Sequence, residues 1–236
     1  MATYYVKNSG NDSATGLSDA LAWRTLAKVN SSTFAPGDFI LFNRGDTWRE
    51  VLEIPSSGTA ANYITFGAYG SGNKPRFFSQ AIQCTNWTTT SYPNIWMSNT
   101  VVPLNPYLIS WQSDIMVEDL DGLVRLMMNR DYTSNFSNLS QPEHWTWNGQ
   151  RIYVYCTSDP DTAYTAINAP QYQHCIELMD QEYLAFDNLD IRYGVLTGIT
   201  DAYWTTELHG LRVTNCHIAG HGSMGGPYAY GIQSHH

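Results

Sequence analysis

The sequence has few charged residues and no apolar run long enough to cross a membrane. Charged residues make up 14% of the 236 residues, whereas an average soluble domain has about 25%. Acidic residues outnumber basic ones by 21 to 12, and the net charge of −9 argues against a surface that binds nucleic acid or an anionic membrane. The strand-like residues 3–6 are not preceded by the basic start and apolar stretch of a secretory signal. We expect either another route or a signal that has been removed.

Cysteine is scarce, and the compact motifs of common catalytic and metal sites are missing. The four cysteines lack the paired spacing of a zinc site, and Cys175 and Cys216 lie inside apolar runs. We therefore expect both as buried free thiols. The chain contains no nucleophile-elbow serine, phosphate-binding loop or HExxH motif. Any chemistry must therefore rest on polar side chains along its strands.

Aromatic and turn-forming residues are abundant, whereas strong helix formers are sparse. The chain has 16 Tyr, 8 Trp and 18 Gly, which is the composition of an extended, turn-rich β protein. Short apolar segments at 39–42, 51–54 and 63–66 begin 12 residues apart, a spacing typical of a sandwich or of a solenoid. The convincing helix signal is Thr25, which can cap a short helix over residues 26–30.

Two segments near the C-terminus repeat each other. Residues 183–191 match residues 210–218 at an offset of 27, with Leu, a large apolar residue, Asn and Ile at equivalent places. A repeat of about 20 to 30 residues, built from very short strands, is the mark of a parallel β-helix. We expect Asn188 and Asn215 to lie above one another at a turn, because Asn tolerates the left-handed backbone that such a corner needs.

The N-terminal segment and the first strands carry a family resemblance over about residues 3–78 and 173–236. It rests on the motifs Tyr4-Tyr5-Val6, Gly10-Asn11-Asp12, Ala22-Trp23-Arg24-Thr25-Leu26, Pro36-Gly37-Asp38, Arg44-Gly45-Asp46-Thr47-Trp48 and Tyr63-Ile64-Thr65-Phe66-Gly67-Ala68-Tyr69-Gly70. These motifs resemble the pectate-lyase-like superfamily, which includes polysaccharide lyases, glycoside hydrolases and phage tailspikes. The resemblance implies an all-β fold, a right-handed parallel β-helix with a short N-terminal capping helix.

Residues 79–172 depart from the coil pattern and hold five of the eight tryptophans. An Asn-Gly pair at 148–149 predicts a hairpin. We expect an inserted antiparallel β subdomain at 79–172, between the cap with the first coils at 1–78 and further coils at 173–236. The chain then stops within a coil and without a polar cap, which predicts an N-terminal portion of a longer protein.

The candidate catalytic site lies on the strands of the C-terminal coils. Side chains alternate faces along a strand, so Glu177 points outward between two core-facing residues. Stacked coils would place polar residues on rungs about 5 Å apart, namely Glu177, Asp180, Asp201, Gln233 and His235. The predicted catalytic residues are Glu177, Asp201 and His235, because a pair of carboxyl groups can hydrolyse a glycosidic bond. The alternative is a solvated face without a catalytic role.

Two tryptophans of the insertion have different expected roles. Trp145 and Trp147 lie two residues apart on one strand and project from the same face. We expect Trp145 to be the more buried, and Trp147 to be the more exposed and able to stack on a sugar. Burial of both rings is the alternative. The predicted substrate-binding residues are Trp147, His221 and Gln233.

Calcium is the cofactor that the sequence favours, provided that three carboxylates cluster. Hard cations take oxygen ligands, which Glu177, Asp180 and Asp201 would supply. Three separately solvated carboxylates are the alternative. The resemblance also implies a Lys or Arg base near calcium in a lyase. The main basic residues of the coils, Arg192 and Arg212, belong to a different strand row from Glu177, which weakens a lyase.

Together these features predict a glycoside hydrolase or polysaccharide lyase that acts on an extended polysaccharide. Its partner would be a glycan, with no nucleic acid bound and no insertion into a membrane. The alternative is a non-catalytic glycan-binding adhesin or a phage tail fibre or tailspike segment, for which a homotrimer is expected. The enzyme would be extracellular, whereas the phage protein would be associated with the virion.

Overall fold

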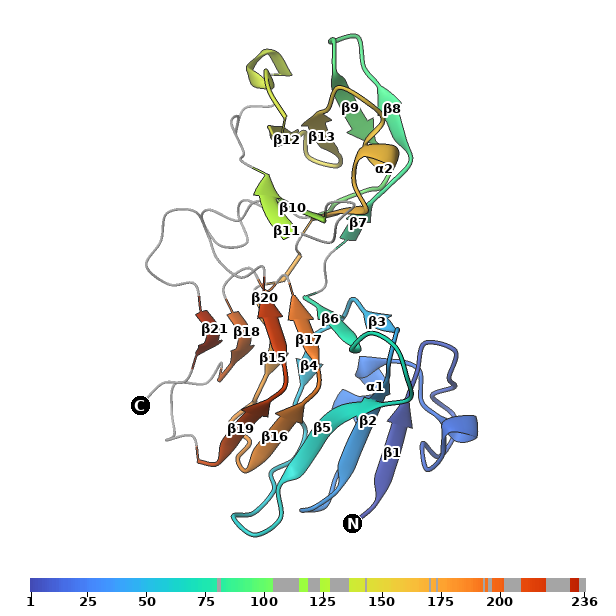
Figure 1. Cartoon of the computed structure of the whole chain (residues 1–236), viewed down its shortest axis with the longest axis vertical. Helices are drawn as coiled ribbons and strands as arrows, with labels where there is room; N and C mark the ends of the chain where they lie inside the picture. The colour runs from blue at the N-terminus through green and yellow to red at the C-terminus, as the bar shows by residue number, and fades with distance from the viewer. Residues whose placement is uncertain are drawn as a thin grey trace. The chain divides into compact units, whose positions relative to one another are not determined.

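The chain is mostly β-structure in the computed structural model (Figure 1). The structure describes residues 1–79, 82–103, 115–118, 124–127, 136–142, 144–169, 171–172, 174–192, 194, 197–201, 209–219 and 230–233. Two compact units divide the chain: unit 1 comprises Met1–Ser79, His174–His221 and Tyr230–His236, and unit 2 comprises Gln80–Gln173 and Gly222–Ala229. Among the described residues, no helix has the length and apolar character needed to cross a membrane.

Unit 1 contains three sheets in which every strand pair is parallel (Figure 1). The first parallel sheet has the order β1 (Thr3–Val6), β2 (Phe39–Asn43), β5 (Ile64–Tyr69), β16 (Leu184–Asp187) and β19 (Leu211–Thr214). The second has the order β3 (Thr47–Trp48), β6 (Arg76–Phe78), β17 (Asp190–Arg192) and β20 (His217–Ala219). The third has the order β4 (Leu52–Glu53), β15 (His174–Glu177), β18 (Thr197–Thr200) and β21 (Tyr230–Gln233).

The 27-residue repeat stacks as the sequence predicts. Strand β16 pairs in parallel with β19, and Leu184 lies opposite Leu211. The turns that follow are also in line, because the Asn188 N–H donates to the Thr214 carbonyl oxygen at 3.2 Å. Asn188 and Asn215 have φ values of 62° and 52°, in the left-handed region that Asn tolerates. The two asparagines therefore mark equivalent corners on neighbouring strands.

Large apolar side chains on alternate strand positions form the core of unit 1. Ile64 and Phe66 of β5 are fully buried, and Phe66 stacks on Phe186 of β16 with the ring centroids 5.4 Å apart. Phe42 and Phe77 meet edge to face at 4.8 Å. Stacked strands thus bring like residues into contact, which removes a continuous apolar surface from water.

The predicted right-handed parallel β-helix is wrong as a description of this fold. The described residues form five separate sheets, three parallel and two antiparallel, and no sheet shares a strand with another. The finding is an all-β arrangement of separate sheets with few helices. The repeat correctly reports which strands stack within a sheet. Closure of the sheets into one solenoid depends on packing between sheets, which a repeat of two short segments does not encode.

The predicted capping helix is also wrong, although its residues are helical. Helix α1 (Leu26–Asn30) has Thr25 as its N-cap, whose hydroxyl accepts a hydrogen bond from the Lys28 N–H at 3.1 Å. A short 3₁₀ turn, η1 (Asp19–Leu21), precedes it. Five residues make little more than one helical turn. Leu26 and Val29 anchor this turn in the core of unit 1, but it is too short to cover the edge of a sheet.

Unit 2 contains two sheets in which every strand pair is antiparallel. One has the order β11 (Val124–Met127), β10 (Ile115–Glu118), β14 (Ala166–Ala169) and β7 (Ile82–Cys84). The other has the order β12 (Trp145–Trp147), β13 (Ile152–Tyr155), β9 (Ile95–Ser98) and β8 (Trp87–Thr89). The predicted hairpin joins β12 to β13, with Gly149 at a φ of 103°. The helical segments of this unit are η3 (Phe136–Asn138) and α2 (Pro160–Ala163).

Candidate functional site

A row of polar residues crosses the third parallel sheet of unit 1. Glu177 of β15 lies opposite Glu53 of β4 on one side and Thr200 of β18 on the other. Thr200 in turn lies opposite Gln233 of β21. The positions before Glu53, Glu177 and Thr200 are apolar residues of the core. Because side chains alternate along a strand, Glu53, Glu177 and Thr200 point away from the core. We call these four residues the carboxylate row.

Sequence reasoning does not find Glu53. Its strand lies far upstream of β15 in the chain, and parallel pairing brings the two together. A signal was nevertheless present, since Glu53 follows a buried Leu within the short apolar segment 51–54. Glu53 and Glu177 are therefore neighbouring carboxyl groups on one face of the sheet. Neighbouring strands lie about 4.8 Å apart.

The two members of this pair differ in exposure. Glu177 has an exposed fraction of 6%, whereas Glu53 is exposed. Asp201, which the sequence predicts as a catalytic partner of Glu177, is also buried, with an exposed fraction of 2%. Asp201 lies one position beyond the carboxylate row, in line with Leu178, whose N–H donates to the Thr200 carbonyl oxygen at 2.8 Å. A solvated face is therefore wrong for Glu177 and Asp201.

The structure does not bring the predicted calcium ligands together. Asp180 lies in the turn after β15, where it and Met179 adopt φ values of 57° and 55°. Among the described residues, no group of three or more His, Cys, Asp or Glu side chains is placed to hold a metal ion. Glu177, Asp180 and Asp201 all belong to the described part of the chain. Calcium binding by these three residues therefore gains no support.

Three predicted residues receive no side-chain placement. His221 and His235 lie outside the described residues. Gln233 is placed by its backbone, which ends β21 in line with Thr200. Its position in the carboxylate row agrees with the register expected from the sequence. Its contact with substrate stays a prediction, as do the roles of the two histidines.

The two tryptophans of β12 follow the predicted order of burial. Trp145 is fully buried, and Trp147 is partly buried. The Trp147 Nε1–H donates to the Val102 carbonyl oxygen at 2.9 Å, and its ring packs against the hydrophobic cluster around Trp145. The Trp147 side chain is thus held in place by unit 2 itself. Stacking on a sugar stays a prediction.

A partly buried histidine, His174, lies at the start of β15. His174 Nδ1 is 2.6 Å from Thr197 Oγ1 on the neighbouring strand. Burial lowers the pKa of His174 to about 4, because the charged imidazolium would lose its hydration. The imidazole is therefore neutral near pH 7. It links β15 to β18 at the end of the strands opposite to the carboxylate row. The sequence offers no signal for this role.

The second parallel sheet carries an ion cluster centred on Asp190. Its carboxylate accepts a hydrogen bond from Arg192 Nε at 2.8 Å and lies 3.4 Å from Arg76 Nε. His217 Nδ1 lies 2.8 Å from the same carboxylate. Asp190 has an exposed fraction of 6%, so its buried charge depends on pairing with Arg76 and Arg192. Arg192, a candidate lyase base in the sequence, is thus engaged in pairing with Asp190.

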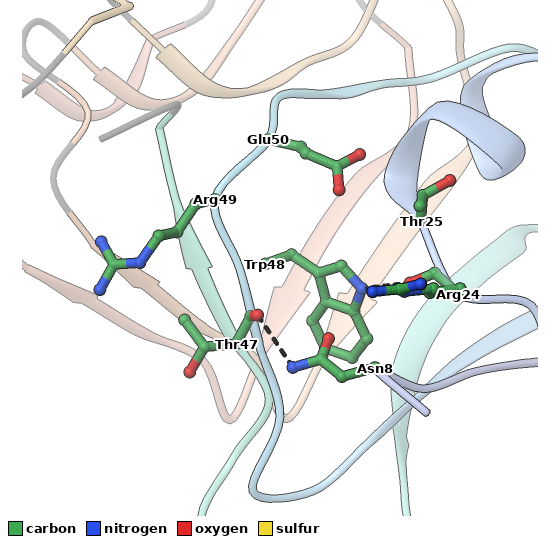
Figure 2. Close-up of a pocket in the computed structure, with 7 residues that line it drawn as sticks. All are labelled: Asn8, Arg24, Thr25, Thr47, Trp48, Arg49 and Glu50. Carbon is green, nitrogen blue, oxygen red and sulfur yellow. Dashed lines mark hydrogen bonds between the residues drawn. The ribbon is translucent and has the colours of Figure 1, made fainter. Parts of the chain in front are cut away.

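Figure 2 shows a polar pocket of about 300 Å³ near the N-terminal segment of unit 1. The Trp48 indole donates to the Arg24 carbonyl oxygen at 2.9 Å, and the Asn8 amide donates to the Thr47 carbonyl oxygen at 3.1 Å. The Glu50 carboxylate accepts a hydrogen bond from the Ala27 N–H at 3.0 Å, at the start of α1. These bonds tie the segment around Trp48 to its neighbours. The pocket includes none of the predicted site residues.

The chain has relatives among carbohydrate-active proteins. No protein-family profile matches it. A lacto-N-biosidase of Bifidobacterium longum is 33% identical over 100 residues, which is 39% of this chain and 6% of that enzyme. The structure of XylC in complex with xylose matches 84% of this chain and 41% of its own, with a TM-score of 0.61 and 14% identity. A lacto-N-biosidase of glycoside hydrolase family GH136 from Eubacterium ramulus matches 94% of this chain and 29% of its own, with a TM-score of 0.48 and 22% identity.

These comparisons correct the resemblance seen in the sequence. The relative with sequence similarity is a lacto-N-biosidase, and membership of the pectate-lyase-like superfamily is not shown. A phage tailspike and a polysaccharide lyase are likewise without support. The XylC likeness, at 14% identity, concerns the fold alone. The chain matches only a small part of the lacto-N-biosidase, and the similarity to a carbohydrate-active enzyme rests on that local match.

Proposed function

We propose that this chain is part of a glycoside hydrolase that acts on a glycan. The observation that carries the proposal is the pairing of Glu53 with Glu177 on one face of the third parallel sheet. The local identity of 33% with a lacto-N-biosidase supports the same reaction class. The proposed hydrolase activity is that of the whole protein, since the match covers only 6% of the lacto-N-biosidase.

Two carboxyl groups are the central requirement of glycoside hydrolysis. One donates a proton to the leaving oxygen, and the other acts as a base or nucleophile. The pair sits about 5 to 5.5 Å apart in retaining enzymes and about 6.5 to 9.5 Å apart in inverting enzymes. Glu53 and Glu177 occupy paired positions on adjacent parallel strands about 4.8 Å apart, so their carboxyl groups can act on the same bond.

The different surroundings of the two glutamates suit a division of roles. Glu177 is covered, and a covered carboxyl group disfavours its charged form, which favours the role of proton donor. Glu53 is exposed to solvent, where its carboxylate can reach a substrate and act as the nucleophile. Thr200 and Gln233 continue the row on the far side of Glu177. Asp201 remains the alternative partner that the sequence favoured.

The proposal is tested by hydrolysis assays on the full chain with a panel of nitrophenyl glycosides and oligosaccharides. We expect Glu177→Gln and Glu53→Gln each to lower turnover by about 10²- to 10⁴-fold, the usual cost of removing an acid–base group. Glu182→Gln is the matched control, because Glu182 lies in the turn after β15 and its side chain is outside the row. The anomer of the first product, followed by NMR, distinguishes retention from inversion.

A binding protein without catalytic activity gives a different result in the same assays. Glycan binding without any cleavage would contradict the hydrolase and support the adhesin alternative. Full activity in both glutamine variants would move the chemistry away from Glu53 and Glu177, and loss in Asp201→Asn would then favour Asp201. An extracellular location remains part of the proposal, and detection of the native protein outside its cells would test it.

A further inference from the structure

We propose a second saccharide-binding site in unit 2, at the loop between β8 and β9. A pocket of about 280 Å³ lies there, lined by residues 89–96 and Thr157. All of these residues belong to unit 2, so the site is separate from the carboxylate row of unit 1. The ligand class that fits this pocket is a neutral sugar, which would be bound and not cleaved.

The lining combines aromatic rings with uncharged polar groups. Tyr92 and Trp96 provide the rings, whereas Thr, Ser and Asn side chains provide hydroxyl and amide groups. None of the described lining side chains carries a charge. Ligand pockets are typically apolar or aromatic, with a few placed polar groups, and span about 300 to 1,000 Å³. A volume of about 280 Å³, just below that range, fits one sugar ring, whose hydroxyls need polar partners and whose C–H face packs on an aromatic ring.

The loop is held in one conformation by its own hydrogen bonds. The Thr90 hydroxyl donates to the Ile95 carbonyl oxygen at 3.0 Å and accepts from the Tyr92 N–H at 3.2 Å. On the other side, the Cys156 N–H donates to the Asn94 carbonyl oxygen at 2.8 Å. The Asn94 amide also donates to the Tyr155 hydroxyl at 3.1 Å. A preorganised site loses little entropy on binding, which favours affinity for a small ligand.

The two aromatic rings are also fixed but remain accessible. The Trp96 indole N–H donates to the Cys156 carbonyl oxygen at 3.0 Å, and its ring is partly exposed. Tyr92 has an exposed fraction of 47%, and its ring lies 5.6 Å from the ring of Phe136. Phe136 in turn packs against Tyr153 at 4.4 Å. The Tyr92 ring is thus supported on one side by the core of unit 2 and open on the other.

A purely structural role explains Trp96 better than it explains Tyr92, because Trp96 also packs against the hydrophobic cluster of unit 2. Tyr92 does not belong to that cluster, and its ring is largely open to solvent. Tyr92 is therefore the residue that separates a binding role from a structural one.

The test is isothermal titration of the full chain with three neutral disaccharides, lactose, xylobiose and chitobiose, and with digalacturonate as the charged comparison. We expect saturable binding of at least one neutral disaccharide and weaker binding of digalacturonate. Tyr92→Ala should weaken binding by about tenfold. Tyr172→Ala is the matched control, because Tyr172 is an exposed tyrosine of unit 2 outside the pocket lining, and it should leave binding unchanged.

A second variant keeps the test decisive if Tyr92→Ala perturbs the loop. Thr157→Tyr places a ring in the pocket from an exposed position and should block binding while the thermal midpoint stays unchanged. Absence of binding to all three neutral disaccharides, or equal binding by wild type, Tyr92→Ala and Thr157→Tyr, would overturn the proposal. The result is independent of the hydrolase proposal, because Glu177→Gln should abolish cleavage and retain this binding.

Discussion

Unit 1 and unit 2 pair their strands in opposite senses, and this difference controls which parts of the chain each core needs. In unit 1, Ile64 of β5 lies opposite Leu184 of β16, although the whole of residues 80–173 separates the two strands in sequence. In unit 2, β12 and β13 are joined by a short hairpin. Parallel strands need long connections, whereas antiparallel strands do not. Unit 1 therefore depends on both ends of the chain, while the described strands of unit 2 all lie within residues 80–173.

The candidate sites of the two units also differ in the kind of polar group they contain. Unit 1 has charged side chains on its sheets, among them the Glu53–Glu177 pair and the Asp190 cluster. The pocket of unit 2 is lined by aromatic rings, hydroxyls and an amide. Charge suits acid–base chemistry, whereas a neutral aromatic surface suits binding. The comparison thus assigns catalysis to unit 1 and glycan capture to unit 2, as two separate proposals.

The sharpest way to break this comparison is to remove one core ring from each unit. Phe186→Ala in unit 1 and Trp145→Ala in unit 2 should each cost about 3 to 5 kcal/mol of unfolding free energy, because both rings are fully buried. Amide hydrogen exchange resolved by residue should show each loss mainly in the unit that carries the change. Trp147→Ala, at a partly buried position, is the control and should cost less. Equal loss of protection in both units would show that they unfold as one.

An intermediate effect is expected at the corner that stacks in unit 1. Asn188 has a left-handed φ of 62°, and its Oδ1 accepts a hydrogen bond from Arg44 at 3.1 Å. Asn188→Ala should cost about 2 kcal/mol, through backbone strain and the lost hydrogen bond. Asn188→Gly should recover the backbone part, because glycine adopts this conformation freely. Urea denaturation measures both, and equal costs would show that the side chain alone matters.

A further expected effect is a pH dependence of the stability of unit 1. The pKa of His174 is lowered by burial to about 4, whereas an unperturbed histidine titrates near 6.5. Between these values the unfolded chain binds the extra proton, so stability is lost as the pH falls from about 6.5 to 4. His174→Gln should flatten this part of the stability curve while retaining a hydrogen-bonding group beside Thr197. An identical pH profile in wild type and variant would contradict the role of His174.

Local features of the fold were predictable because they depend on neighbours in sequence. The Thr25 N-cap, the Asn-Gly hairpin and the left-handed Asn188 and Asn215 all follow from local backbone preferences. The parallel pairing of the repeat followed from the recurrence of apolar residues. The overall architecture did not follow. The step from stacked strands to a closed β-helix used a family resemblance that the comparisons did not support.

The candidate site was predictable only in part. The outward register of Glu177 follows from the alternation of side chains along β15, but its burial depends on what covers the sheet, which no local pattern encodes. Asp201 was expected just beyond this register, and it directly follows the last residue of β18. The expected calcium cluster does not assemble among the described residues. Glu177 lies on β15, Asp180 in the turn after it, and Asp201 directly after β18.

The sequence by itself determined the all-β character, the strand repeat, the local caps and turns, and the acidic balance of the chain. These properties follow from residue preferences within a few positions, together with composition. Only the tertiary structure decided that Glu53 lies beside Glu177, that Asp190 is held by Arg76 and Arg192, and that Tyr92 borders a pocket. Each of these depends on long-range strand pairing or loop packing, whose geometry is set by the whole folded chain and not by any local pattern.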